Sequence, residues 1–223
     1  MNDLHSSIKL IVAGGLLLTV QLLYAQENLE EKPEKRLEMS VDVFSGASSI
    51  VTGVGFKKNG AIGSSQYHYT PTFGFGGDLG YSLLPRLSVH ASVGYLQRGA
   101  EFTMLNTTEK RTFQLYYVDA WGYFEYATLD KVKFTFLSGL TQSTLIAARL
   151  TALGGNSSVM GDFKRMDFGF IAGPGVFLPV HKHKIRIRAL FSYGFRDVFA
   201  ENHFNDNIKA HNHAYLFQVG YIW

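Results

Sequence analysis

The chain has 223 residues, of which 46% are hydrophobic, 14% aromatic and 17% charged, and it contains no cysteine. The absence of cysteine excludes a disulfide scaffold, a cysteine-ligated metal centre and a lipid anchor on cysteine. Outside the N-terminus there is no apolar run of about 18 residues, which excludes a bundle of membrane-spanning helices. The net charge of +3 comes from dispersed basic residues, so we expect no nucleic-acid partner.

Residues 1–25 have the features of a secretory signal peptide. Lys9 supplies the positive flank, residues 10–23 form a mostly apolar stretch, and Ala25 is a small residue suited to a cleavage site. Such a stretch is short for a helix that crosses a membrane. An uncleaved N-terminal anchor is the alternative interpretation.

Residues 26–36 are predicted to be a flexible charged leader. They contain almost no apolar side chains, so they cannot bury enough surface to offset the entropy of ordering. Residues 37–223 then form a single domain. Its excess of Lys and Arg over acidic residues suits a surface that faces anionic lipid.

Three segments in the first half of this domain alternate between apolar and small or polar residues, which is the period of a β-strand. They are residues 38–44, 73–83 and 87–97. The second segment places Phe73, Phe75 and Leu79 on one face, with glycines and Asp78 on the other. The pattern predicts strands with one apolar face each.

Five further segments complete the pattern. They are residues 112–126, 132–140, 166–178, 185–195 and 215–223. Residues 112–126 are aromatic on both faces, so their facing is ambiguous. The last segment is the clearest, because its aromatic face consists of Tyr215, Phe217, Val219, Tyr221 and Trp223.

The connections between these segments alternate in length. Short ones fall at residues 84–86, 127–131 and 180–184, and long ones at 45–71, 99–111, 143–164 and 199–211. Short turns on one side and long loops on the other are typical of outer-membrane barrels, with the turns in the periplasm. We therefore predict an all-β fold, an eight-stranded antiparallel transmembrane β-barrel with up-and-down topology.

The same alternation is compatible with two other structures. In a soluble sandwich or lipocalin-like barrel the apolar faces would point inward, but glycine, serine and scattered charges suit a narrow lumen better than a solvent surface. A ten-stranded barrel would form if residues 50–56 and 61–69 paired as an additional hairpin.

The chain resembles the PorT-like outer-membrane β-barrel proteins of the Bacteroidota. The resemblance lies in FGFGGDLGYSL (73–83), LYYVDAWGYFEY (115–126), MDFGFIAGPGVFL (166–178) and RALFSYGFRDVF (188–199), and it covers roughly residues 37–223. Trp121 departs from the family pattern, which usually has proline there.

This resemblance implies residence in the outer membrane and assembly by the barrel-insertion machinery. The aromatic face of the last strand, Tyr215 to Trp223, matches the assembly signal that such barrels present. The family's named member is linked to protein secretion, but a shared fold does not establish that role here.

Alternation predicts seven charged side chains that face the lumen. They are Asp78, Arg98, Asp119, Asp167, Arg186, Arg188 and Arg196. Charges in a narrow interior require partners. We favour an arginine–carboxylate network that fills a closed barrel over a selective path or proton relay, because a conducting pore normally needs more than eight strands.

Other candidate sites are weaker. His181 and His183 lie in a predicted turn and His203, His211 and His213 in or near the last loop, but no ordered metal-ligand spacing occurs, so we expect no metal or other cofactor. His90 and Ser92 share a predicted lumen face, but two residues along a strand do not give the geometry of a nucleophile and its base. We expect no enzymatic activity.

The predicted long loops supply the leading hypothesis for function. Residues 48–56 and 143–153 are unusually apolar for exposed segments, and such segments either dock on a partner or pack over the mouth of the barrel. We expect an interaction module that holds partner proteins through its loops or periplasmic face. The alternatives are a small-solute or ion channel with an Arg/Asp-lined lumen and, third, a lipid-modifying enzyme.

Overall fold

The structure is a computed structural model that describes residues 37–52, 67–103, 109–128, 132–152, 155–200 and 210–223. These residues form β1 (Leu37–Thr52), β2 (Thr70–Leu84), β3 (Leu87–Thr103), β4 (Lys110–Ala127), β5 (Lys133–Ala152), β6 (Gly155–Ser158), β7 (Met166–Val180), β8 (His183–Gly194) and β9 (Ala210–Ile222). A short 3-10 turn, η1 (Met160–Asp162), follows β6. Within the described residues, no helix is long and apolar enough to span a membrane.

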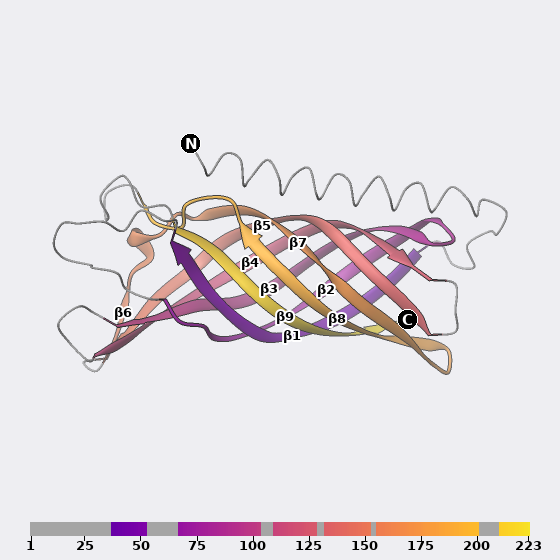
Figure 1. Cartoon of the computed structure of the whole chain (residues 1–223), viewed down its shortest axis with the longest axis horizontal. Helices are drawn as coiled ribbons and strands as arrows, with labels where there is room; N and C mark the ends of the chain where they lie inside the picture. Colours follow the sequence, from indigo (N-terminus) through magenta and orange to yellow (C-terminus); the bar gives the residue numbers. More distant parts are fainter. Residues whose placement is uncertain (1–36, 53–66, 104–108, 129–131, 153–154, 201–209) are drawn as a thin grey trace.

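Eight of the strands close into a barrel (Figure 1). Apart from β6, strands that follow one another in the chain pair antiparallel, and β9 returns to pair with β1 over residues 40–52. β6 lies outside the ring and pairs only with the C-terminal end of β5, residues 149–152. The predicted fold class, an eight-stranded antiparallel barrel, is confirmed, and the ten-stranded alternative is wrong.

The two faces of the wall follow the predicted alternation. Phe75, Phe134 and Leu140 point outward and remain more than 60% exposed (63%, 62% and 67%). Leu96 and Leu115 point inward and are completely buried. An apolar exterior around a filled lumen is the arrangement of a barrel that lies in lipid, because closure leaves no unpaired sheet edge there.

The structure shows which face of β4 points into the lumen, a question that the sequence of residues 112–126 left open. Tyr117, Asp119, Trp121, Tyr123 and Glu125 are all buried in the lumen. The alternate residues Tyr116, Val118 and Ala120 face outward at least partly exposed. Because both faces carry aromatic rings, only the closure of the barrel decides which of them fills the interior.

Three strands extend far into predicted long loops, so the predictions for those three loops are partly wrong. β1 continues to Thr52, β3 to Thr103 and β5 to Ala152, through much of the regions 45–71, 99–111 and 143–164. The apolar residues 143–152 belong to a strand, with Leu145 and Ala148 buried inside. Of the other apolar segment, residues 48–52 belong to β1 and residues 53–56 lie outside the described residues.

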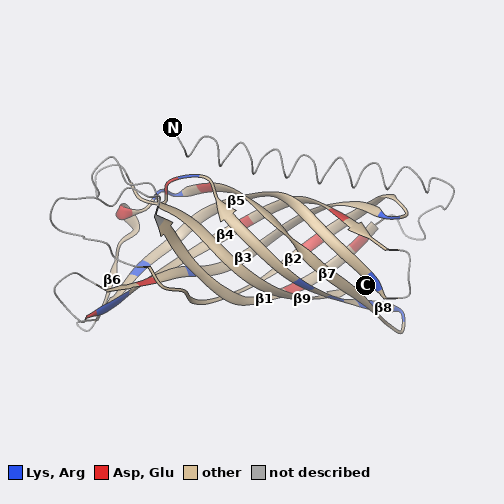
Figure 2. Cartoon of the chain, in the orientation of Figure 1, with Lys and Arg blue, Asp and Glu red and all other residues tan. Residues whose placement is uncertain are grey.

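The extra length forms a feature that we call the outer sheet, made of residues 97–103 of β3, 110–115 of β4, 145–152 of β5 and β6. It extends the wall at the end with the long connections, here called the outer end, on the left of Figure 1. The short turns lie at the opposite, inner end. Figure 2 shows the charged positions gathered toward these two ends.

Candidate functional site in the barrel lumen

The inner half of the lumen contains a buried ionic cluster around Arg186 of β8. Its guanidinium donates to both carboxylate oxygens of Asp42 at 2.7 and 2.8 Å and to Asp78 Oδ1 at 3.0 Å. Nη2 of Arg186, the atom that donates to both Asp42 oxygens, also donates to the hydroxyl of Ser40 at 2.7 Å. Three strands, β1, β2 and β8, are therefore joined across the interior by one side chain.

A second arginine, Arg188, extends this cluster toward β4. Its guanidinium donates to both carboxylate oxygens of Glu125, with Nε 3.1 Å from Oε1. Nη1 also donates to the hydroxyl of Tyr123 at 2.9 Å, and the guanidinium lies 5.2 Å from the Tyr123 ring centroid. The two arginines neutralise carboxylates from three different strands, which is the arrangement that makes buried charge tolerable.

His90 links the two arginine sites. Its Nδ1 lies 2.8 Å from Asp78 Oδ1, and its Nε2 lies 2.8 Å from Ser88 Oγ and 3.4 Å from Glu125 Oε2. The ring stacks on Tyr123 at 4.8 Å. We define the inner network as Asp42, Asp78, His90, Tyr123, Glu125, Arg186 and Arg188.

The predicted proximity of His90 to Ser92 does not produce a pair. Ser92 donates instead to the main-chain oxygen of Gly77 at 3.0 Å, and Ser88 is the serine that contacts the imidazole. The order Ser88, His90, Asp78 resembles a nucleophile relay, but a second carboxylate, Glu125, also faces the ring. Both ring nitrogens of His90 are therefore occupied by contacts with Ser88, Asp78 and Glu125, which hold the imidazole within the ionic cluster.

A second polar group, the outer network, lies nearer the outer end. Arg98 pairs with Asp119 and donates to Ser143 Oγ at 3.2 Å. The amide of Asn212 donates to Asp167 at 3.2 Å and to the hydroxyl of Tyr117 at 3.0 Å. The outer network consists of Arg98, Tyr117, Asp119, Asp167 and Asn212.

An apolar middle layer separates the two networks. It consists of Phe44, Leu96, Trp121, Leu137, Ile171, Leu190, Ala214 and Leu216, all at most 6% exposed. Phe44 and Trp121 meet edge to face at 4.9 Å from opposite sides of the lumen. Along β4, for example, Asp119 of the outer network and Tyr123 of the inner network lie on either side of Trp121.

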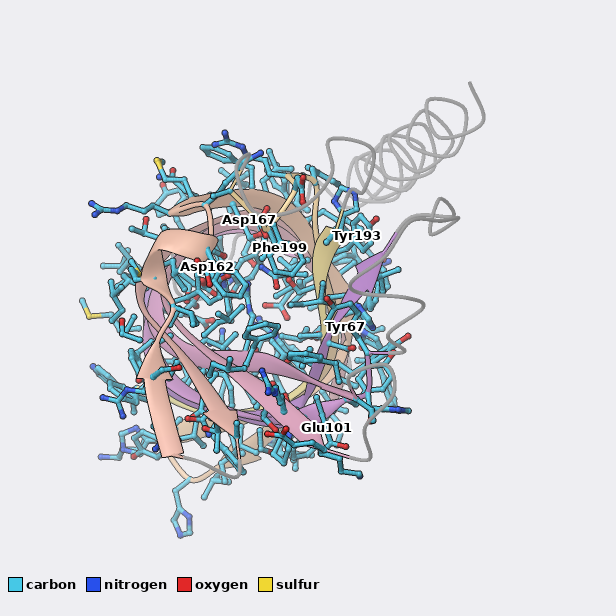
Figure 3. All side chains as sticks on the ribbon, turned by 90° about the vertical axis from the view of Figure 1, so that its left-hand side faces the viewer. Tyr67, Glu101, Asp162, Asp167, Tyr193 and Phe199 are labelled. Carbon is cyan, nitrogen blue, oxygen red and sulfur yellow. The ribbon has the colours of Figure 1, made fainter. Side chains whose placement is uncertain are left out.

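An apolar cap covers the outer network. Phe113 of β4 contacts Phe163 at 5.2 Å, and Phe163 contacts Phe199 at 5.3 Å between ring centroids. The side chain of Asp197 holds the cap, because its Oδ1 accepts hydrogen bonds from the main-chain amides of Phe199 and Ala210 at 3.3 and 3.1 Å. The view into the outer end shows Phe199 and Asp167 near the centre of the opening (Figure 3).

Tyr67 packs against the same cap, before β2 begins. Burial raises the pKa of Tyr67 to about 12. The phenol therefore stays uncharged at physiological pH, which suits an apolar cluster.

Six of the seven predicted lumen charges are buried where alternation places them, and they divide between the two networks. The seventh prediction is wrong, because Arg196 is exposed and lies beyond the end of β8 at Gly194. Only its main-chain amide contacts the site, 3.3 Å from Asp167 Oδ1.

Several members of the networks were not among the predicted site residues. Glu125, Tyr117 and Tyr123 share the alternating face of β4 with Asp119, and that spacing could have identified them. Asp42 lies on the polar face of the first predicted strand. Alternation already placed His90 on a predicted lumen face, but only cross-strand pairing brings His90 and Asn212 to their partners.

The predicted histidine sites are dispersed. His181 and His183 lie at the inner end, whereas His211 and His213 lie at the start of β9, where His213 contacts the hydroxyl of Tyr69 at 2.7 Å. His203 lies outside the described residues. No group of three or more potential ligands in the described ranges is arranged to hold a metal ion.

A closed, eight-stranded barrel with an apolar exterior and an ion-paired interior defines an integral outer-membrane β-barrel protein. A family model described as "Outer membrane protein beta-barrel domain" matches residues 24–200. The chain belongs to this family. No curated protein is similar enough in sequence to count as a match.

Several solved structures are similar to this chain at low identity. The attachment invasion locus protein Ail of Yersinia pestis is 17% identical, with a TM-score of 0.40 over 85% of this chain and 100% of Ail. Neisserial surface protein A is 15% identical, with a TM-score of 0.44 over 82% of this chain and 95% of that protein. OprG of Pseudomonas aeruginosa is 12% identical, with a TM-score of 0.45 over 86% of this chain and 97% of OprG.

Proposed function

We propose that this protein is a non-enzymatic, non-conducting scaffold of the outer membrane that holds a partner protein at its outer end. The observation that carries the proposal is the outer sheet, which continues the wall for several residues beyond the apolar belt. A barrel needs strands of only about ten residues to cross the membrane, yet β4 and β5 have 18 and 20. The additional length serves no purpose within lipid.

The surface of the outer sheet supports this proposal. All four residues of β6 are exposed, and β6 has a strand on only one side among the described elements. Its sequence, GNSS, is polar, which keeps an exposed edge soluble until it meets a partner. Free edges of this kind accept extended segments of other proteins.

The packing and ion pairing of the lumen support a scaffold function rather than a channel function. The charges of the inner network are ion-paired, Arg98 pairs with Asp119, and Asp167 accepts a hydrogen bond from Asn212. Two apolar layers separate and cover these networks. Moving a hydrated solute through the lumen would require breaking buried ion pairs, each of which is costly to separate.

Photo-crosslinking in intact cells tests the proposal. A photoreactive amino acid replaces Asn156 in β6 or, as a control, Phe134 on the lipid-facing wall. We expect a discrete protein adduct from position 156 and none from position 134. If both positions give the same adducts, or position 156 gives none, the outer sheet is not a binding surface.

The second candidate function is an ion channel, favoured by the charge in the lumen. Recording from the purified protein in planar bilayers distinguishes the two. The scaffold proposal expects no conductance steps above the background of empty bilayers. Reproducible steps from the heat-modifiable, folded form would reject it in favour of the channel.

We also propose the route by which the chain reaches the membrane. Residues 1–25 would direct export, and the barrel-insertion machinery would recognise the last strand. Tyr215, Phe217, Tyr221 and Trp223 are all outward and at least 44% exposed in the folded barrel, which supports their availability along one face. The motifs in residues 73–83 and 166–178 support a relationship to the PorT-like proteins of the Bacteroidota.

A further inference from the structure

The outward face of β3 and β4 changes from apolar to polar at a border that lies at Tyr95 and Tyr116. On β4 the outward residues from Tyr126 to Val118 are apolar or aromatic, Tyr116 follows, and Gln114 is polar. Ten residues separate Tyr126 from Tyr116, roughly 33 Å along a strand. At the usual tilt this is about 25 Å along the membrane normal, the height of the apolar band of such barrels.

Tyrosines mark this border. Tyr116 of β4 stacks with Tyr95 of β3, with ring centroids 6.2 Å apart, and Tyr95 contacts Phe75 of β2 at 5.6 Å. Rings with one polar group prefer the boundary between the hydrocarbon and the lipid headgroups. Side chains directly above Tyr116 therefore lie at the level of the headgroups of the outer leaflet.

Arg149 of β5 occupies that position. Its guanidinium carbon lies 5.7 Å from the centroid of the Tyr116 ring, and its side chain is exposed. Neighbouring cations on β4 already have carboxylate partners, since Lys110 pairs with Glu101 and Arg111 with Glu109. No carboxylate in the described part of the chain forms an ion pair with Arg149.

Two hydrogen-bonding side chains flank Arg149 on the same face. Gln114 of β4 and Ser158 of β6 are its direct cross-strand partners, and such partners project to the same side of a sheet. The hydroxyl of Tyr116 donates to Gln114 Oε1 at 3.2 Å. Because the amide oxygen is occupied in this way, the amide nitrogen is oriented to donate elsewhere.

We propose that Arg149, Gln114 and Ser158 form a binding site for the phosphate of an outer-leaflet lipid headgroup. The planar guanidinium supplies two parallel donors that match phosphate oxygens. The amide and the hydroxyl add donors on either side, and the tyrosines below contact the apolar part of the same lipid. This site is on the outer wall and is independent of the proposed partner binding by β6 as a strand edge.

The position favours a lipid over free phosphate. An exposed arginine gains little from a soluble ion, because water and salt screen the interaction. A lipid is already held beside the wall by the apolar belt, so its phosphate is presented at a high effective concentration. Basic side chains near a membrane surface act in the same way on anionic headgroups.

Native mass spectrometry of the purified protein in detergent tests the site. The probes are monophosphoryl lipid A, its dephosphorylated form and inorganic phosphate. We expect Arg149→Gln to lower the fraction bound to the phosphorylated lipid about tenfold, and Gln114→Ala or Ser158→Ala by about threefold. Arg149→Lys should recover part of the binding, because it restores charge without the bidentate geometry.

Arg165→Gln is the charge-matched control, because Arg165 is an exposed arginine just before β7 with the same loss of charge. It should bind the lipid as the unmodified protein does. Retained heat modifiability of each variant shows that the barrel is folded. Equal binding by Arg149→Gln, or equal binding of the dephosphorylated lipid, would overturn the proposal. Full competition by millimolar inorganic phosphate would instead assign the site to the soluble ion.

Discussion

At the scale of single residues, the stability of the interior depends on a few arginines. Arg186 is 1% exposed and contacts Asp42, Asp78 and Ser40. Replacing one partner of a buried ion pair removes its attraction and leaves the other charge without compensation. The same argument does not apply to Arg196, whose side chain is exposed.

We predict that Arg186→Gln destabilises the barrel by about 3–5 kcal/mol, because two buried carboxylates lose their guanidinium. Arg196→Gln should change stability by less than about 0.5 kcal/mol. Urea titration of the refolded protein, followed by heat modifiability on gels, measures both. A small effect of Arg186→Gln would mean that water, rather than Arg186, compensates the carboxylates.

At the scale of elements, glycines allow strands to approach closely in a narrow barrel. Gly46 of β1 faces β9, and a Cβ at this position would collide with the main-chain carbonyl oxygen of Tyr215. β1 and β9 form the seam where the two ends of the sheet meet. Gly122 of β4 differs, because a Cβ there meets nothing within 4 Å.

We predict that Gly46→Ala lowers stability by about 1–3 kcal/mol, since the seam must shift to admit one methyl group. Gly122→Ala should be neutral or slightly stabilising, because alanine restricts the unfolded chain more than glycine does. Both variants add one methyl group, so the difference between their urea midpoints measures the cost of that group at the seam between β1 and β9. Equal midpoints would contradict the close approach of β1 to β9.

At the scale of the whole molecule, the lumen is closed twice. The cap around Phe163 and Phe199 covers the outer end, and the middle layer around Phe44 and Trp121 lies beneath it. The two layers share β1, β3, β4, β5 and β9 but consist of different residues at different heights of the barrel, so weakening one leaves the other in place. Closure is therefore a property of the assembled barrel and not of any single loop.

We predict that Phe199→Ala lowers stability by about 3 kcal/mol through the cavity it leaves in the cap, without opening a pore. The middle layer still closes the lumen, so planar bilayers containing this variant should show no conductance steps. The control is the unmodified protein recorded in the same lipid. Conductance steps in the variant alone would show that the cap is the only seal.

Alternation along the chain was sufficient to predict eight strands, the outward face of most of them and six of the seven lumen charges. A period of two is a local property, because successive side chains of a strand point to opposite sides. Alternation did not predict the facing of β4 or the end of β8, because local sequence does not determine these features. Both faces of β4 are aromatic, and the end of β8 before Arg196 depends on neighbouring strands.

The partners of the charges required the tertiary structure. The sequence alone determined that Asp78, Arg186 and Arg188 face inward, because facing follows from alternation. Which carboxylate meets which arginine depends on cross-strand register and on closure of the ring, which place Glu125 and His90 beside residues far away in the chain. The outer sheet and the Arg149 site also arise only there, because pairing beyond the membrane, rather than the membrane itself, determines where β3, β4 and β5 end.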